Sequence, residues 1–160
     1  MPQPDRAPVL DEHAVAFVHG GVAAVVATRD ADLRPQITRA WGPHLSADGY
    51  ELTICVIAPA GSKTRENLES NGAIAVVCCP PTIARAIQFK GKVVATNEPD
   101  ADDLVRADEH MRAFGEECAR IGLSASEVRQ LFRRSELLAV QVDVSDAFEQ
   151  SPGPTAGRRL

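Results

Sequence analysis

The chain has 160 residues, 44% of them hydrophobic, and a formal net charge of −5. That length is enough for one domain with its own core. The acidic balance argues against nucleic acid as a partner, because a phosphate backbone needs a basic protein surface. The apolar run 14–18 is too short to cross a membrane and is interrupted by a Gly-Gly pair. We therefore expect a cytoplasmic protein with no membrane contact.

The first third of the sequence predicts a helix followed by three strands. Residues 1–10 contain three prolines and no periodicity, so we expect a flexible arm. A short helix over 11–19 begins at Asp11 as its cap and ends at two glycines. The apolar run 22–28 predicts a strand buried on both faces. Strands over 35–42 and 51–57, joined by polar turns, complete an antiparallel meander.

The middle of the chain predicts a short helix and two more strands. Ser62 is a natural N-cap for a helix over 62–70, which Asn71-Gly72 ends. The apolar run 73–79 predicts a strand that stops at two prolines. A longer strand over 84–96 contains Gly91, which indicates a bulge or bend.

The last third predicts two helices and a final strand. Apolar residues recur at spacings of three and four over 100–121, which predicts the strongest helix of the chain. Ser124 and Glu127 form the capping box of a second helix, and 137–144 alternates as a strand. We expect a domain over 11–150 and a tail over 151–160. Six antiparallel strands with few helices predict a mainly β (α+β) barrel, closed or partly closed, with peripheral helices.

Cysteine and histidine give no strong catalytic or metal signal. The four cysteines lack C-x-x-C spacing, so buried reduced thiols are expected and a redox or metal role is the lesser alternative. The four histidines lack metal-ligand spacing, and we predict no metal site. His44 is the only histidine that directly follows the predicted strand over 35–42, so it is the one histidine to consider further.

The segment 61–68, Gly-Ser-Lys-Thr-Arg-Glu-Asn-Leu, is the most informative stretch. It places a glycine, two hydroxyls and two cations in the first turn of a helix, where free N–H groups and the helix dipole attract anions. The sequence predicts a phosphate site at Ser62, Lys63 and Thr64. An ordinary capped surface helix explains the same residues equally well.

Two further polar residues interrupt apolar strands. Arg39 shares a strand face with Ile37 and Trp41, so it needs either a surface ion pair or a bound anion. The meander would bring it next to the strand that leads into Ser62. Gln88 offers a donor and an acceptor to a planar polar ring, or it belongs to a solvent-facing polar row.

These segments together resemble the pyridoxamine 5'-phosphate oxidase-like, FMN-binding split-barrel family. The resemblance rests on the strand that contains Arg39, on 62–68, on the strand 73–79 and on Gln88-Phe89-Lys90-Gly91-Lys92-Val93. It implies a six-stranded antiparallel Greek-key split barrel, a homodimer, and two flavins at the dimer interface. It also implies residue roles: Arg39, Ser62, Lys63 and Thr64 on the FMN phosphate, the backbone of Ala40, Trp41, Ile57 and Ala58 along the flavin edge, and Gln88 on the ring or the ribityl chain.

The functional expectation is an FMN-dependent oxidoreductase that acts on a small molecule. Vitamin B6 oxidase activity is not expected, because the tryptophan-arginine signature near the C-terminus is missing and Trp41 is the single tryptophan. The alternative is a carrier or sensor that binds flavin without turnover. A third possibility keeps the fold and replaces FMN with the deazaflavin F420 or with haem.

Overall fold

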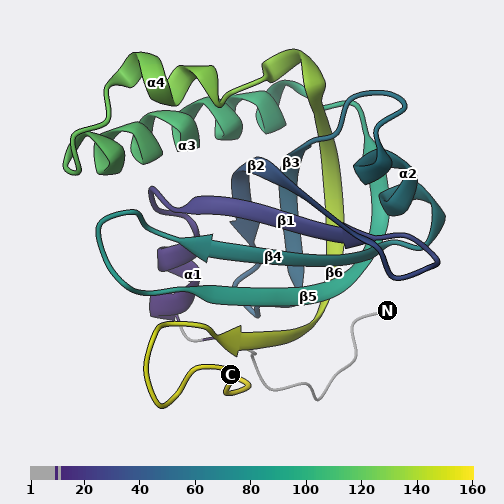
Figure 1. Ribbon diagram of the computed structural model, residues 1–160, viewed down its shortest axis with the longest axis horizontal. Helices are drawn as coiled ribbons and strands as arrows, with labels where there is room; N and C mark the ends of the chain where they lie inside the picture. The colour runs from purple at the N-terminus through teal and green to yellow at the C-terminus, as the bar shows by residue number, and fades with distance from the viewer. Residues whose placement is uncertain (1–9, 11) are drawn as a thin grey trace.

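The computed structural model describes residue 10 and residues 12–160. The expected arm over 1–10, apart from Leu10, and the predicted cap Asp11 lie outside the described residues. Figure 1 shows a β-barrel with helices at its margins. The elements follow in the order α1 (Glu12–Val18), β1 (Ala23–Arg29), β2 (Pro35–Leu45), β3 (Glu51–Ile57), α2 (Lys63–Ser70), β4 (Ala73–Cys79), β5 (Ile87–Asn97), α3 (Ala101–Ala119), α4 (Ala125–Gln130), a 3-10 turn (Arg134–Glu136) and β6 (Leu137–Glu149).

The six strands close into an antiparallel barrel in the order β1-β2-β3-β6-β5-β4. The meander β1-β2-β3 is confirmed, and β6 enters between β3 and β5 as the Greek-key crossing. The expected bulge at Gly91 is present, since the β5–β6 register shifts between Lys90 and Gly91. A Cβ at Gly91 would overlap the carbonyl oxygen of Asp143, so only glycine fits this crossing.

Two separate apolar clusters hold the molecule together. The first fills the barrel with small and branched side chains, among them Val26, Ile54 and Val140, all fully buried. The second lies outside the barrel, where α3 covers β2 and β3 around Trp41 and Phe114. The strong 3–4 periodicity of α3 is thereby explained, because its apolar stripe packs on the barrel wall.

Helix ends agree with the sequence pattern. Asp100 caps α3 in a capping box with Asp103, and Ser124 caps α4 with Glu127. α2 begins after the predicted N-cap Ser62. Among the described helices, none is both long and apolar enough to cross a lipid bilayer.

Some predicted strand limits and faces were wrong. β2 continues through Gly42 to Leu45, because a bulge absorbs the irregular Gly-Pro pair within the strand. β6 runs on to Glu149 because β5 offers partners along this length, and β5 begins at Ile87. β1 is not buried on both faces: its residues alternate between buried and half-buried, since no helix covers its outer side (Figure 1).

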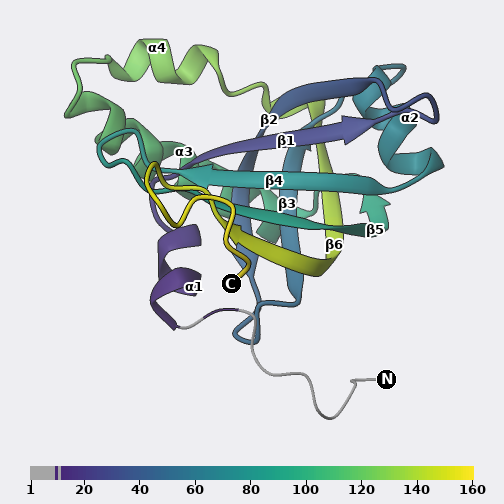
Figure 2. The ribbon, with the colours of Figure 1, turned by 60° about the horizontal axis from the view of Figure 1, so that its bottom comes forward.

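The tail 151–160 folds back on its own β6. Phe148 pairs with Arg159, and the amide of Leu160 donates to the carbonyl of Ala147. Figure 2 shows this segment crossing the end of the barrel near α1. In this structure the tail therefore pairs with the end of β6 and stays exposed on its other side.

Candidate functional site

The start of α2 is built by a tight turn at the end of β3. The amide of Ser62 donates to the carbonyl of Pro59, and Gly61 has φ +76°, the left-handed conformation that this turn requires. The Ser62 hydroxyl accepts the amide of Arg65, and the Ser62 carbonyl accepts the amide of Glu66. The amides of Lys63 and Thr64 lack intrahelical partners because they lie in the first turn, so they remain available to a ligand.

The side chains at this turn are exposed on one side and buried on the other. Lys63 pairs with Glu66 at 2.6 Å, and that carboxylate raises the pKa of Lys63. Thr64 is buried. Gly61 is exposed, and a Cβ added at this position would have no atom within 4 Å. The turn thus combines open space at Gly61 with two amides that lack intrahelical partners and with an exposed lysine, features that an oxyanion site uses.

Arg39 lies elsewhere in this structure. Its guanidinium lies 6.0 Å from the ring centroid of Phe114 on α3, while Lys63 pairs within α2, so the two cations are not brought together. The strand that carries Arg39 is connected to α2 through β1. Arg39 pairs with Val25, three residues along β1 from Thr28, which bonds Asn67 of α2. Three strand residues span about 10 Å.

The four residues predicted to line a flavin edge have different surroundings. Ala40 points into the barrel, and Trp41 is buried beneath α3. The Ile57 carbonyl accepts the Thr38 hydroxyl at 2.9 Å. The Ala58 amide donates to the carbonyl of Glu136 at 2.9 Å. The ends of β2 and β3 are therefore tied to each other and to the segment before β6.

Gln88 and Arg39 lie in one register row on the outer face of the barrel. The strand pairings align Arg39 of β2, Val25 of β1, Val77 of β4 and Gln88 of β5. Three strand spacings separate the two polar ends by about 14 Å. The next row repeats the pattern with Ile37, Ala27, Ala75 and Lys90. No helix lies in front of β1, β4 and β5 in Figure 1, whereas Arg39 of β2 lies beside Phe114 of α3; Ile37 is 72% exposed.

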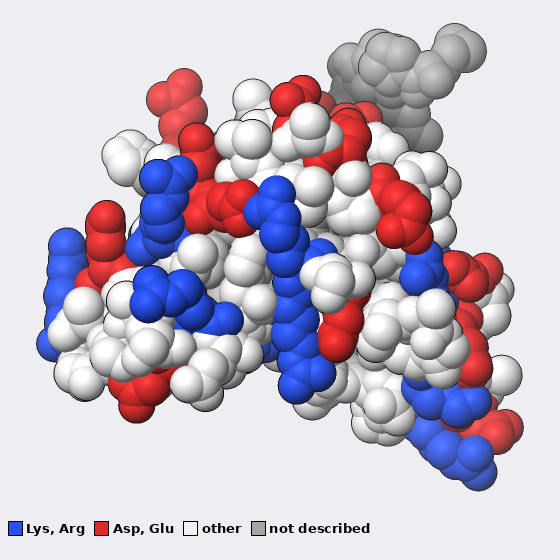
Figure 3. All heavy atoms as spheres, turned by 90° about the horizontal axis from the view of Figure 1, so that it is seen from above, with Lys and Arg blue, Asp and Glu red and all other residues white. Residues whose placement is uncertain are grey.

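An open groove of about 740 Å³ lies on the side of α2 where Glu98 contacts that helix. It is lined by Glu98 and Pro99 after β5, by Leu104 of α3, and by the segment 132–137 with Arg133 and Arg134. Glu98 also pairs with Arg65 of α2 at 3.0 Å, which fixes the groove beside that helix. Figure 3, which looks down on the molecule from the α3–α4 side, shows a run of Lys and Arg across the middle of the face. This acidic chain therefore carries local basic surface.

Sequence reasoning missed a cavity that three of the four histidines share. His19, His44 and His110 line one space of about 370 Å³ between β2 and α3. The rings of His19 and His44 stack at a centroid distance of 4.9 Å. These residues are 25 and 66 positions apart in the sequence, so no local spacing signals the cluster. Among the described residues, no group of three or more His, Cys, Asp or Glu side chains is placed to hold a metal ion.

The cysteines are free thiols, as predicted. Burial raises the pKa of the Cys55 thiol and of the Cys78 thiol to about 12. Both are therefore protonated at neutral pH and serve packing, because the thiolate is the reactive form.

The architecture defines a class of protein: a six-stranded Greek-key split barrel with a short helix after the third strand and a longer helix before the last. A family model described as pyridoxamine 5'-phosphate oxidase matches residues 10–147. The chain belongs to this family, which confirms the resemblance and the fold class expected from the sequence.

Solved structures with the same fold share little sequence with it. HupZ of Group A Streptococcus is 19% identical with a TM-score of 0.54, covering 92% of this chain and 99% of that one. An FMN-binding protein from Syntrophomonas wolfei is 11% identical with a TM-score of 0.51, covering 88% of each chain. A protein from Clostridium acetobutylicum, related to general stress protein 26 of B. subtilis, is 11% identical with a TM-score of 0.50, covering 81% of this chain and 80% of that one. No curated protein matches the sequence.

Proposed function

We propose that this protein binds FMN with the phosphate at the start of α2 and works as a flavin-dependent oxidoreductase on a small molecule. The observation that carries the proposal is the turn at Gly61–Thr64. Two amides there lack intrahelical partners, the exposed Lys63 of the same turn carries an ammonium that pairs with Glu66, and the space at Gly61 is open. The residues present thus fit a phosphate monoester.

The uncovered outer face supports a place for the ring system. The rows that end in Arg39, Gln88 and Lys90 have apolar middles made of valine and alanine, which suits a flat ring with polar edges. The half-buried outward residues of β1 and β4 suit a homodimer in which a second copy covers this face and encloses the cofactor. In that arrangement Gln88 and Arg39 lie on the ring or ribityl side and Ser62, Lys63 and Thr64 on the phosphate side.

The residues available determine which tasks fall to the protein and which to the bound cofactor. Bound FMN supplies hydride and electron transfer. Lys63 and the first-turn amides hold the phosphate, and the packed ends of β2 and β3 fix the backbone of Ala40, Trp41, Ile57 and Ala58 along the flavin edge. The groove beside α2, shaped by α3 and the segment before β6, is the proposed substrate entrance. The free thiols suit a reducing compartment such as the cytoplasm.

The test compares FMN with riboflavin, which lacks the phosphate. The purified full-length protein is expected to bind FMN more tightly than riboflavin. Lys63→Ala should weaken FMN binding about tenfold and leave riboflavin binding unchanged, since it removes one charge-assisted contact. Lys63→Arg should retain most of the preference, and Arg129→Ala on exposed α4 is the matched control. Arg39→Ala should weaken both ligands if Arg39 faces the ring, and FMN alone if it reaches the phosphate.

Two results would refute the proposal. Failure of the wild-type protein to take up FMN on reconstitution removes the function, and unchanged FMN affinity in the Lys63→Ala, Arg39→Ala double variant moves the phosphate elsewhere. An absorption spectrum of the purified protein separates FMN from F420 and haem. Steady turnover with NADH or NADPH and an acceptor separates an oxidoreductase from a carrier or sensor.

A further inference from the structure

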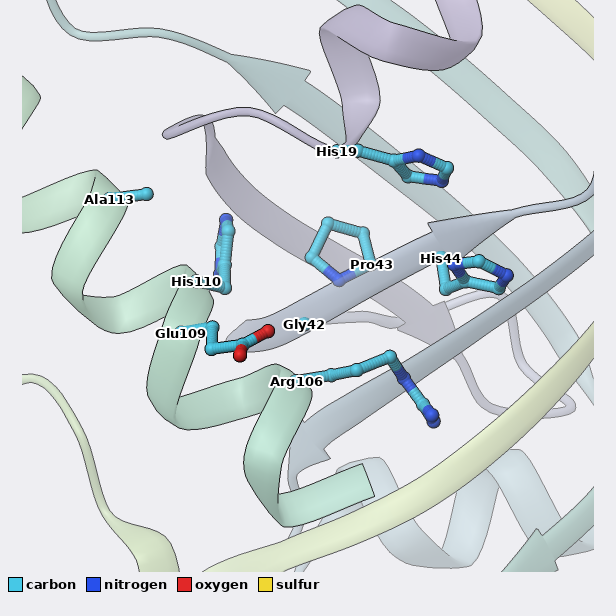
Figure 4. A pocket seen from close by; sticks show the side chains of 8 residues that line it. All are labelled: His19, Gly42, Pro43, His44, Arg106, Glu109, His110 and Ala113. Carbon is cyan, nitrogen blue, oxygen red and sulfur yellow. The ribbon is translucent and has the colours of Figure 1, made fainter. Parts of the chain in front are cut away.

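The cavity between β2 and α3 is lined largely by polar side chains. Figure 4 shows Pro43 at its centre, with Glu109 and His110 on one side and Arg106, His19 and His44 on the other. Its volume of about 370 Å³ lies in the range of small-molecule sites. Pro43 is buried, whereas His19, His44 and Glu109 are exposed around the mouth.

Two glycines bring the walls together. Gly42 has φ +61°, and a Cβ there would lie 2.9 Å from the amide nitrogen of Ala107. A Cβ at Gly21 would lie 2.5 Å from the carbonyl oxygen of Ala113. The barrel and the segment after α1 therefore contact the backbone of α3 directly at two points, one turn to either side of His110. The bulge in β2 between Trp41 and His44 leaves the space between these contacts.

His110 presents an unpaired acceptor in this wall. Its side chain is 7% exposed, and its Nε2 lies 2.9 Å from the carbonyl oxygen of Val22, to which it must donate. The Nδ1 atom then carries a lone pair, and it is buried without a hydrogen-bond partner. Burial lowers the pKa of His110 to about 4, so the ring is neutral at pH 7. A buried acceptor of this kind costs free energy until a donor reaches it.

The charges around the cavity leave one carboxylate uncompensated. Arg106 pairs with Asp103, and its Nε–H is buried without a partner. For Glu109, the described part of the chain shows no ion pair or hydrogen bond. The Nε2 of His19 accepts the amide of Leu45, and burial, with His44 next, lowers the pKa of His19, which favours a neutral ring. The cavity therefore attracts positive charge.

We infer that the cavity binds a small organic ammonium ion. The ammonium N–H donates to Nδ1 of His110 and its charge is balanced by Glu109, while an uncharged oxygen at the other end of the molecule accepts the Nε–H of Arg106. The carbon chain lies on Pro43. This site involves neither the α2 turn nor the outer face, so it stands independently of FMN.

The experiment uses 4-amino-1-butanol as the probe and 1,4-butanediol as its uncharged isostere, at constant ionic strength and pH 7.5. Long-range ¹H–¹⁵N spectra follow Nδ1 of His110, and fluorescence follows Trp41, the single tryptophan, whose ring contacts His110 at 5.7 Å. A probe of about six heavy atoms should bind with a millimolar Kd. The diol should bind at least tenfold more weakly.

Variants then test whether Glu109 balances the charge of the ammonium ion. Glu109→Gln should weaken the amino alcohol about tenfold and leave the diol unchanged, since it removes the counter-ion and keeps the size. Glu116→Gln, two turns along the exposed side of α3, is the matched control and should have no effect. No saturable shift of Nδ1 up to about 100 mM probe, equal binding of amine and diol, or full affinity in Glu109→Gln would each overturn the proposal and leave a cavity that holds only water.

Discussion

The turn before α2 and the cavity behind the β2 bulge are assembled in different ways. The turn comes from six consecutive residues, Pro59 to Thr64, and its caps and charges are satisfied by near neighbours in sequence. The cavity comes from three distant segments around His19, Gly42–His44 and Arg106–Ala113. Two of its polar atoms, Nδ1 of His110 and Nε of Arg106, are buried without a hydrogen-bond partner. A short-range polar pattern is thus visible in sequence, whereas a buried unpaired group exists only after packing.

The largest expected effect tests the close contact that forms the cavity. Gly42→Val should lower the free energy of unfolding by about 3 kcal/mol, because the side chain meets the backbone of α3 and the left-handed φ is unfavourable for valine. Gly61→Ala has a similar φ but open space, so it should cost only about 1 kcal/mol. Urea denaturation of both variants measures the difference. Equal losses would mean that backbone strain alone matters and that the contact at Ala107 can relax.

A second expected effect is a dependence of stability on pH that originates in the cavity. The folded pKa of His110, about 4, is below its unfolded value, so protonation favours the unfolded state. The stabilisation by the neutral ring is complete above pH ~6.5 and is lost as the pH falls toward 4, by roughly 3 kcal/mol in total. His110→Gln, which cannot titrate and can still donate to the Val22 carbonyl, should remove this part of the dependence.

The measurement is the free energy of unfolding at several values between pH 7.5 and pH 4.5 for the wild type and His110→Gln. Carboxylates titrate in both proteins, so the difference between the two curves isolates His110. Parallel curves would show that the ring is already protonated or solvated in the folded protein.

The smallest expected effect concerns the turn. Ser62→Ala removes the hydroxyl that accepts the Arg65 amide and should cost about 1 kcal/mol. Ser62→Gly should cost only a few tenths of a kcal/mol, because glycine is a tolerated N-cap. Thermal unfolding of the two variants gives the comparison. A loss as large as that of Gly42→Val would mean that α2 contributes more to the barrel than its exposed position indicates.

Much of the fold followed from local patterns. The limits of β3 and β4, the caps of α2 and α4, and the bulge at Gly91 were predicted from alternation, capping residues and glycine. Errors arose where contacts with a neighbouring helix or strand overrode the local signal. β2 passes through Gly42 because the bulge is stabilised by α3, and β6 extends beyond Val144 because β5 pairs with it.

The candidate site shows the same difference between residues that a local pattern predicts and residues that depend on tertiary structure. Ser62, Lys63 and Thr64 were named from sequence because helix capping and charge act within one turn, where spacing along the chain equals proximity in space. The row from Arg39 to Gln88 depends on strand order and register, which alternation alone does not fix.

The sequence by itself determined the elements, their order and the anion-attracting turn, since hydrogen bonding and side-chain periodicity over a few residues specify these. Tertiary structure decided which outer face is left uncovered and that His19, His44 and His110 share one cavity. The physical reason is that burial and missing partners are properties of packed segments, and close contacts at Gly21 and Gly42 bring those segments together.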